Sequence, residues 1–225
     1  MATESKVDIF NLALEALGHR NTVSSPTEAS REAELCSLWY PRVYRSVGKA
    51  AHWGCLKAPK RLAQLSERNT STDWDSTQPL PPWNYAHGLP ADLLAPQYLA
   101  TYDRFEIGVH GTVRALFSDL EEPILIYSRL DVNISLWDEG FTNAFIYTLG
   151  AMIARPLTGK SIRAQELYQL AQISIMDARE QEANDSQVQF ETIPDWLIAR
   201  GVSGPSSGHD RYFYPYGPVL TNSNV

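Results

Sequence analysis

The sequence has few cysteines and no long hydrophobic run. Its two cysteines, Cys36 and Cys55, have no histidines at metal-ligand spacing, which argues against a zinc site. Both lie in apolar patterns, so we expect buried thiols. No apolar run approaches the ~20 residues that cross a bilayer. The first residues, Met1 to Ser5, lack a basic region followed by an apolar core. We therefore expect no signal peptide, no membrane association and synthesis in a reducing cytoplasm.

Basic residues are also scarce. The chain has 19 Lys and Arg against 26 Asp and Glu, giving a net charge of −7 and a pI near 5.2. Proteins that hold nucleic acid by neutralising phosphates need clustered basic residues, so this balance argues against that class. It is compatible with a surface along which DNA slides, because an acidic wall repels phosphate.

Apolar residues recur at three- and four-residue steps in four segments. This spacing predicts helices over residues 5–17, 25–54, 136–154 and 161–184. Gly18 is the expected stop of the first helix. The second helix is expected to begin with Ser25 as its N-cap, Pro26 at the first position and Glu28 at the third. Pro41 lies inside that pattern and predicts a kink.

The third helix carries apolar residues on more than one face, which predicts a segment buried on several sides. We expect Ser135 as its N-cap, with Asp138 three residues later, and Arg155-Pro156 as its end. The fourth helix is expected to turn one side inward, formed by Leu167, Leu170, Ala171, Ser174 and Ala178.

Short alternating segments between residues 56 and 130 predict a small antiparallel β region. Expected strands lie near 62–66, 83–85 and 124–127, with an exposed loop over 69–82. Residues 105–109 and 112–116 flank His110-Gly111, which predicts a hairpin with a two-residue turn. The predicted class is α+β, mainly α. Two N-terminal and two C-terminal helices form a four-helix core over residues 1–185, and the β region is inserted between them.

Residues 186–225 have no helical or strand pattern and are expected to form an extended arm. A Gly/Ser/Pro linker at 201–208 precedes four aromatic residues within a few positions. Such a segment favours docking on a partner, although packing on its own domain is the alternative. The candidate docking residues are Trp196, Tyr212, Phe213, Tyr214 and Tyr216. Core or interface packing is also the expected role of Trp53, Trp74, Trp83 and Trp137.

Chemical motifs are weak. Ala154 to Ser161 approaches a phosphate-binding loop, but its first position is not Gly and a helical pattern precedes it, so a helix–helix turn around Gly159 is favoured. The pairs Glu121-Glu122 and Asp138-Glu139 are sequence neighbours, whereas sugar hydrolysis needs carboxylates across a cleft. The five histidines are expected in turns and on the surface. We predict no catalytic residues, no cofactor and no metal site.

Several segments together resemble one family. They are Asn11 to Leu14 with Leu17-Gly18; Ser25 to Glu28 followed by Ala33, Cys36, Tyr40-Pro41, Arg45, Val47 and Trp53; Lys60 to Ala63; Tyr85 with Leu89 to Asp92; and Tyr127, Asp131, Trp137, Phe141 and the 151–159 turn. In order and spacing they are similar to the head-to-tail adaptors of short-tailed bacteriophages, the tail tubular protein A family. The resemblance covers roughly residues 5 to 185. Ser46 departs from the family pattern, which often has Asp there, and the family often has Phe near Cys55.

The resemblance implies a non-enzymatic virion protein at the head–tail junction. It implies a ring, commonly of twelve copies, that joins the portal protein to the tail nozzle protein and extends the channel for double-stranded DNA without sequence-specific binding. The helices would build the ring wall, and the β region would project toward the tail. The alternatives are a tail-associated cell-wall hydrolase and a small helical regulatory protein.

Overall fold

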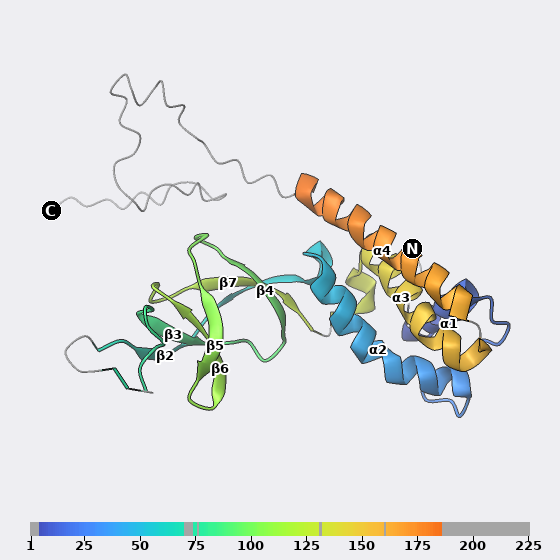
Figure 1. The fold of residues 1–225 in the computed structure, drawn as a ribbon, viewed down its shortest axis with the longest axis horizontal. Helices are drawn as coiled ribbons and strands as arrows, with labels where there is room; N and C mark the ends of the chain where they lie inside the picture. Colours follow the sequence, from blue (N-terminus) through green and yellow to red (C-terminus); the bar gives the residue numbers. More distant parts are fainter. Residues whose placement is uncertain (1–4, 70–73, 76, 131, 160, 186–225) are drawn as a thin grey trace, which may run out of the picture. The chain divides into compact units, whose positions relative to one another are not determined.

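Four helices and two small antiparallel sheets make up the part of the protein that the structure describes, which confirms the α+β class (Figure 1). The computed structural model describes residues 5–69, 74–75, 77–130, 132–159 and 161–185. The helices are α1 (Lys6–Leu17), α2 (Arg31–Ala50), α3 (Glu139–Thr158) and α4 (Ser161–Asp185), with short 3-10 turns η1 (Gly54–Leu56) and η2 (Ile134–Leu136). No helix among the described residues is long and apolar enough to span a bilayer.

Local capping sets both ends of α1, and of the two caps only the one at Gly18 was predicted. The Ser5 hydroxyl accepts a hydrogen bond from the Asp8 amide at 3.2 Å, and the Asp8 carboxylate accepts one from the Ser5 amide at 2.7 Å. This reciprocal pair satisfies two amides that the first turn leaves free. Gly18 ends the helix with a left-handed φ of 78°, a conformation that costs glycine little. The predicted first helix and its stop are confirmed.

The predicted start of the second helix is wrong by five residues. Ser30, not Ser25, is the N-cap of α2, and its hydroxyl accepts from the Ala33 amide at 3.2 Å. The segment from Ser25 forms a separate turn in which the Glu28 amide donates to the Ser25 carbonyl at 3.1 Å. Glu28 also accepts from the amide and hydroxyl of Ser24, at 2.8 and 2.7 Å. Local polar side chains therefore satisfy this backbone without a helix.

Hydrogen bonds from Ser30 and Ser24 lower the pKa of Glu28 to about 2, so the turn is held by a carboxylate. At its other end, α2 stops at Ala50 rather than near residue 54, because Ala51 adopts extended backbone. Pro41 does lie inside the helix, as predicted. The kink expected there stays a prediction.

Both predicted ends of the third helix are wrong. Asp138 is the N-cap of α3 and accepts from the Phe141 amide at 2.6 Å, whereas Ser135 lies in η2. Pro156 does not end the helix, which continues to Gly159 with its φ of 69°. Pro156 lies in the last turn, so the lost backbone bond and the crowding by its ring disturb only the end of the helix. The prediction of burial on several sides is confirmed, since half of the α3 residues are buried.

The β region forms two sheets rather than one. The strands are β1 (Lys57–Arg61), β2 (Gln64–Glu67), β3 (Tyr85–Gly88), β4 (Leu93–Leu99), β5 (Glu106–His110), β6 (Val113–Ser118) and β7 (Ile124–Arg129). The sheet orders are β1-β7-β4 and β2-β3-β6-β5, and all pairs are antiparallel. Sequence patterns missed β1 and β4, which contain Pro59 and Pro96; both are edge strands, where proline is tolerated.

The predicted hairpin exists with its turn one residue later. His110 pairs with Val113, so the turn residues are Gly111 and Thr112. Gly111 has a φ of 60°, and Thr112 does not have a positive φ, a pattern typical of a Gly-X turn in a hairpin. The expected short strand at Trp83 begins instead at Tyr85.

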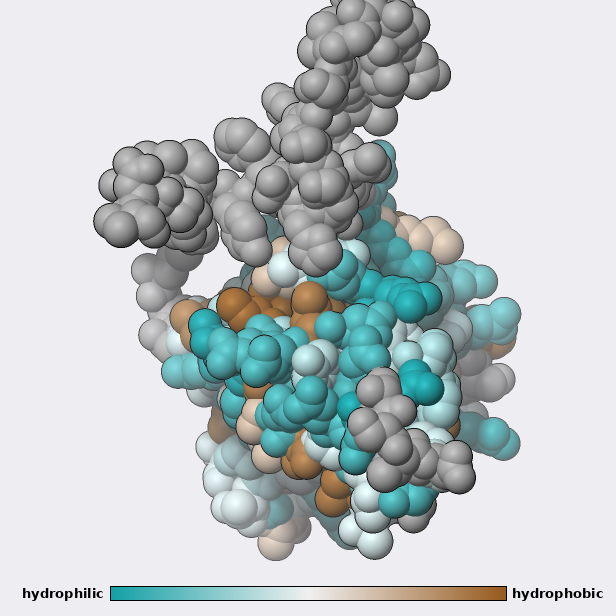
Figure 2. All heavy atoms as spheres, turned by 90° about the vertical axis from the view of Figure 1, so that its left-hand side faces the viewer, coloured by the Kyte–Doolittle hydropathy of each residue, from teal (hydrophilic) through white to brown (hydrophobic). Residues whose placement is uncertain are grey.

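Helix α3 lies between α2 and α4 and also contacts α1 (Figure 1). The largest core cluster comes mostly from these helices and centres on Phe10, Phe141, Phe145 and Leu149. A second cluster joins residues of both sheets, namely Leu62, Leu99, Leu116, Leu125 and Tyr127. On the side that Figure 2 presents, hydrophobic residues form separate areas among hydrophilic ones.

Candidate interaction site at the helix ends

The aromatic residues predicted to dock on a partner lie outside the described residues. Trp196, Tyr212, Phe213, Tyr214 and Tyr216 all belong to residues 186–225. The candidate site that the structure does describe is therefore a different one, at the ends of three helices.

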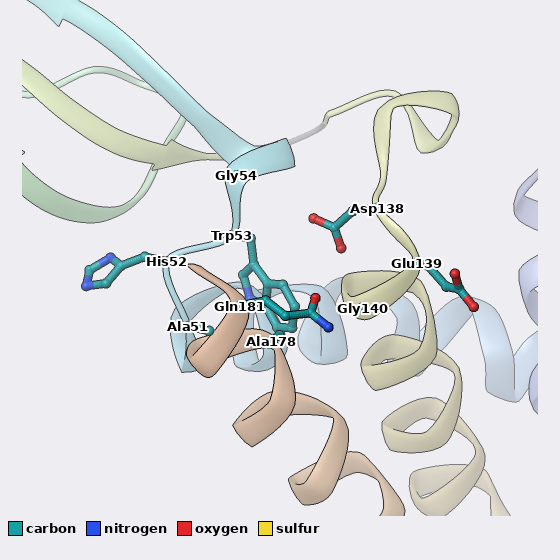
Figure 3. A pocket seen from close by; sticks show the side chains of 9 residues that line it. All are labelled: Ala51, His52, Trp53, Gly54, Asp138, Glu139, Gly140, Ala178 and Gln181. Carbon is teal, nitrogen blue, oxygen red and sulfur yellow. The ribbon is translucent and has the colours of Figure 1, made fainter. Parts of the chain in front are cut away.

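A cavity of about 220 Å³ lies where the end of α2, the start of α3 and the last described part of α4 meet (Figure 3). Three separate segments supply its walls. Its lining consists of Ala51, His52, Trp53, Gly54, Asp138, Glu139, Gly140, Ala178 and Gln181. The small residues Gly140 and Ala178 leave the space that the cavity occupies.

Trp53 gives the cavity its rigid apolar wall. The side chain is buried, its Nε1–H donates to the Val47 carbonyl at 2.7 Å, and its ring packs edge-on against Phe141 with centroids 5.1 Å apart. A tryptophan with a satisfied N–H and a fixed ring presents a preformed surface rather than an adaptable one.

Polar groups form the other side of the cavity. The carboxylate of Asp138 caps α3, and Glu139 follows in its first turn, where the helix dipole favours negative charge. In Figure 3 the Asp138 carboxylate points toward Trp53 and Gln181, whereas the side chains of His52 and Glu139 extend away from them. The site thus combines an apolar wall with the carboxylate of Asp138.

The Arg179 guanidinium joins two helix ends beside the cavity. Its Nε donates to the Ala50 carbonyl at 2.8 Å, and Nη2 donates to the same oxygen. That carbonyl lies in the last turn of α2, where basic side chains satisfy free carbonyls and the helix dipole together. This contact joins α4 to the end of α2 beside the cavity.

These residues suit binding rather than covalent chemistry. Burial raises the pKa of the Cys55 thiol, which lies beside Asp138, to about 12, so it is a weak nucleophile at neutral pH. Among residues 5–185, leaving out the undescribed positions, no group of three His, Cys, Asp or Glu side chains could hold a metal ion.

The other sequence candidates are separate from this site. Glu122 forms an exposed ion pair with Arg61 at 2.7 Å. Residues Ala154 to Gly159 form the end of α3, which confirms the favoured helix–helix turn over a phosphate loop. The expectation of surface histidines is wrong for His87, which is fully buried and bonded through Nε2 to the Leu120 carbonyl at 2.9 Å. Cys36 is buried, as expected, whereas the expectation of a buried thiol is wrong for Cys55, which is only half-buried.

The cavity itself was missed because its walls come from three distant segments. Only tertiary packing brings Trp53, Asp138 and Gln181 together, and none of them carries a local motif. No protein-family model matches this chain, and none of the curated proteins matches it significantly.

Proposed function

We propose that this protein is a structural virion protein, a ring-forming head-to-tail adaptor of a short-tailed bacteriophage. In this proposal about twelve copies join the portal protein to the tail nozzle protein, and DNA passes through the channel without sequence-specific contacts. The four helices form a core that builds the ring wall, and the inserted β region faces the tail.

One observation carries the proposal: residues of the resemblance from separate segments contact one another. Tyr40 stacks on Trp137 with ring centroids 6.5 Å apart, and Trp53 packs against Phe141. The Tyr127 hydroxyl donates to Asp92 Oδ1 at 3.0 Å. Motifs that are individually weak thus belong to one packed framework, which supports reading them together.

The experiment is mass photometry of the full chain mixed with the portal ring of the same phage. The expected result is a complex that gains about one copy of this protein per portal subunit. An intact portal ring without added mass would contradict the proposal. A peptidoglycan zymogram on the same sample tests the hydrolase alternative, because a cell-wall hydrolase would produce a cleared band.

The aromatic arm has its own test. We propose that Tyr212, Phe213, Tyr214 and Tyr216, with Trp196, anchor on the portal or on a neighbouring subunit. A chain ending at Gly201 should then bind the portal ring more weakly than the full chain. A matched chain ending at Val225 with Tyr212, Phe213, Tyr214 and Tyr216 changed to Ser should behave like the truncation. Unchanged affinity in both would refute the anchor.

A further inference from the structure

Two exposed helix faces of opposite character flank the helical core. One belongs to α2 and the other to α4, and both helices pack their inner faces toward α3 (Figure 1). Their outer faces therefore point away from the shared core of the described residues.

The outer face of α2 is basic. Arg42, Arg45 and Lys49 recur at three- and four-residue steps, are all exposed, and form no ion pair with any residue that the structure describes. Leu38, one turn earlier, is 52% exposed. From Leu35 to Ser66 the sequence contains no acidic residue at all. Within the chain, the Arg42 guanidinium packs over the Trp39 ring at 5.3 Å, and Lys49 lies in the last turn of α2, where the helix dipole favours a base. Like charges at these spacings still destabilise a helix, so a partner of opposite charge would relieve them.

The outer face of α4 is apolar and acidic. Ile162, Ile173 and Met176 are 74%, 53% and 63% exposed, whereas Leu167 and Ala171 on the opposite side are buried. Leu170, predicted on the inner side, is 40% exposed and belongs to the outer face. Asp177 and Glu180 lie beside Met176, are exposed, and have no ion-pair partner within the described part of the chain.

The two faces are similar in length and opposite in charge. Arg42 to Lys49 and Ile173 to Glu180 are each separated by seven residue steps, or ~10 Å along a helix. Leu38 would meet apolar α4 side chains while the bases meet Asp177 and Glu180. Because the matching faces lie on different helices of one chain, the contact is head-to-tail, and repeating it produces a closed ring when the rotation allows.

We infer that the outer face of α2 binds the outer face of α4 on a second copy of this chain. This inference rests on the proposed ring and names its subunit contact. DNA phosphates are the competing occupant of the basic face. However, DNA binding would leave the exposed Ile162, Ile173 and Met176 on α4 uncovered, whereas a second copy of the chain would cover both faces.

Charge reversal tests the contact in the full-length protein without the portal. Variant one is Arg45→Glu with Lys49→Glu, and variant two is Asp177→Lys with Glu180→Lys. Each variant carries like charges on both faces, so each alone should self-associate at least about tenfold more weakly than wild type. Sedimentation velocity at high protein concentration and low salt measures this, and circular dichroism checks folding.

An equimolar mixture of the two variants is the decisive sample. The acidic α2 of variant one faces the basic α4 of variant two, and the remaining faces also match, so association should return. The matched control, Lys60→Glu with Arg114→Glu, makes equal charge changes on exposed residues of the sheets and should associate like wild type.

Three results would overturn the inference. The first is a wild-type protein that stays strictly monomeric under these conditions. The second is a mixture that associates as weakly as each variant alone. The third is a variant one that binds duplex DNA less tightly than wild type but self-associates as strongly. Portal binding is measured separately by mass photometry. If the wild type binds the portal but the mixed variants do not associate, only the proposed subunit contact is refuted. If the mixed variants associate but the wild type does not bind the portal, only the adaptor function is refuted.

Discussion

A methyl group on Gly48 would overlap the side chain of Leu94. Gly48 lies on α2 and Leu94 on β4, so this close approach joins the helical core to the three-stranded sheet. The same added methyl would lie 3.2 Å from Cδ1 of Leu56. Both leucines are buried, so the Leu94 side chain would have to shift within the core to make room for the methyl group. The absence of a side chain at Gly48 is therefore a packing requirement.

Gly48→Ala should lower the free energy of unfolding. Overpacking costs ~1–3 kcal/mol, and the helix gain of Ala over Gly offsets only about 0.5–1 kcal/mol of it. Urea unfolding measures the difference. Leu94→Val removes the overlapping atoms, so the double variant should be more stable than the sum of the two single changes predicts. Additive effects would show that the two residues do not compete for space.

Gly140→Ala is the opposite case on another helix. A methyl group there would meet Asp138 Oδ1, Ala178 Cβ and the Trp53 ring at 3.5, 3.6 and 3.7 Å, all ordinary contact distances. Gly140 lies in the first turn of α3, so the substitution should stabilise the protein by about 0.5–1 kcal/mol. A higher urea midpoint with an unchanged slope is the expected measurement. A loss of stability would show that the cavity wall has no room.

Tyr127→Phe tests the hydrogen bond between β7 and the turn before β4. Burial, with the Asp92 carboxylate beside it, raises the pKa of the Tyr127 hydroxyl to about 12, so the group is a neutral donor at working pH. Losing a bond to a charged acceptor should cost ~1.5–3 kcal/mol in urea unfolding. Tyr168→Phe is the matched control, because that side chain is half exposed. Equal effects at both sites would contradict the role of this bond.

The buried His87 side chain should make the free energy of unfolding depend on pH. Burial lowers its pKa below the usual 6.5, and Nδ1 has no hydrogen-bond partner. Between the lowered pKa and 6.5 the unfolded chain binds more protons than the folded one, so stability falls as pH falls through this window. Urea unfolding at pH 7.5 and 5.5 should show this loss in wild type and a smaller loss in His87→Gln. Equal losses would assign the pH dependence to other groups.

Sequence periodicity found the elements whose local signals agree. Ser5 and Gly18 bracket α1, and the Gly111 turn closes its hairpin within one residue of the expected position. Local sequence signals gave wrong predictions where the same residues are compatible with two local structures. The Ser25 to Glu28 motif caps a turn as well as it could cap a helix, and Pro156 is compatible with the last turn of α3.

Tertiary features were harder to predict. The β4 strand contains Pro96 and pairs with the distant β7, so no short window identifies it. The α4 pattern carries apolar residues on two sides, and only packing against α3 shows that Leu167 points inward and Ile173 outward. In contrast, the basic face of α2 was visible in principle, because acidic residues are absent from Leu35 to Ser66.

Pro41→Ala separates folding of the subunit from assembly of the proposed ring. Pro41 lies in the interior of α2, immediately before the basic residues Arg42, Arg45 and Lys49. Alanine restores an amide that can bond to the carbonyl one turn earlier, and it removes the crowding that bends helices at proline. The unfolding free energy should therefore stay equal or rise.

The same change should straighten α2 and redirect the half that carries the basic face, so ring assembly on the portal should be impaired. Mass photometry with the portal ring measures the copies bound, and urea unfolding measures the subunit. A variant that is stable but binds fewer copies fits the expected kink. Normal ring assembly would show that the direction of α2 after Pro41 has no part in the contact between subunits.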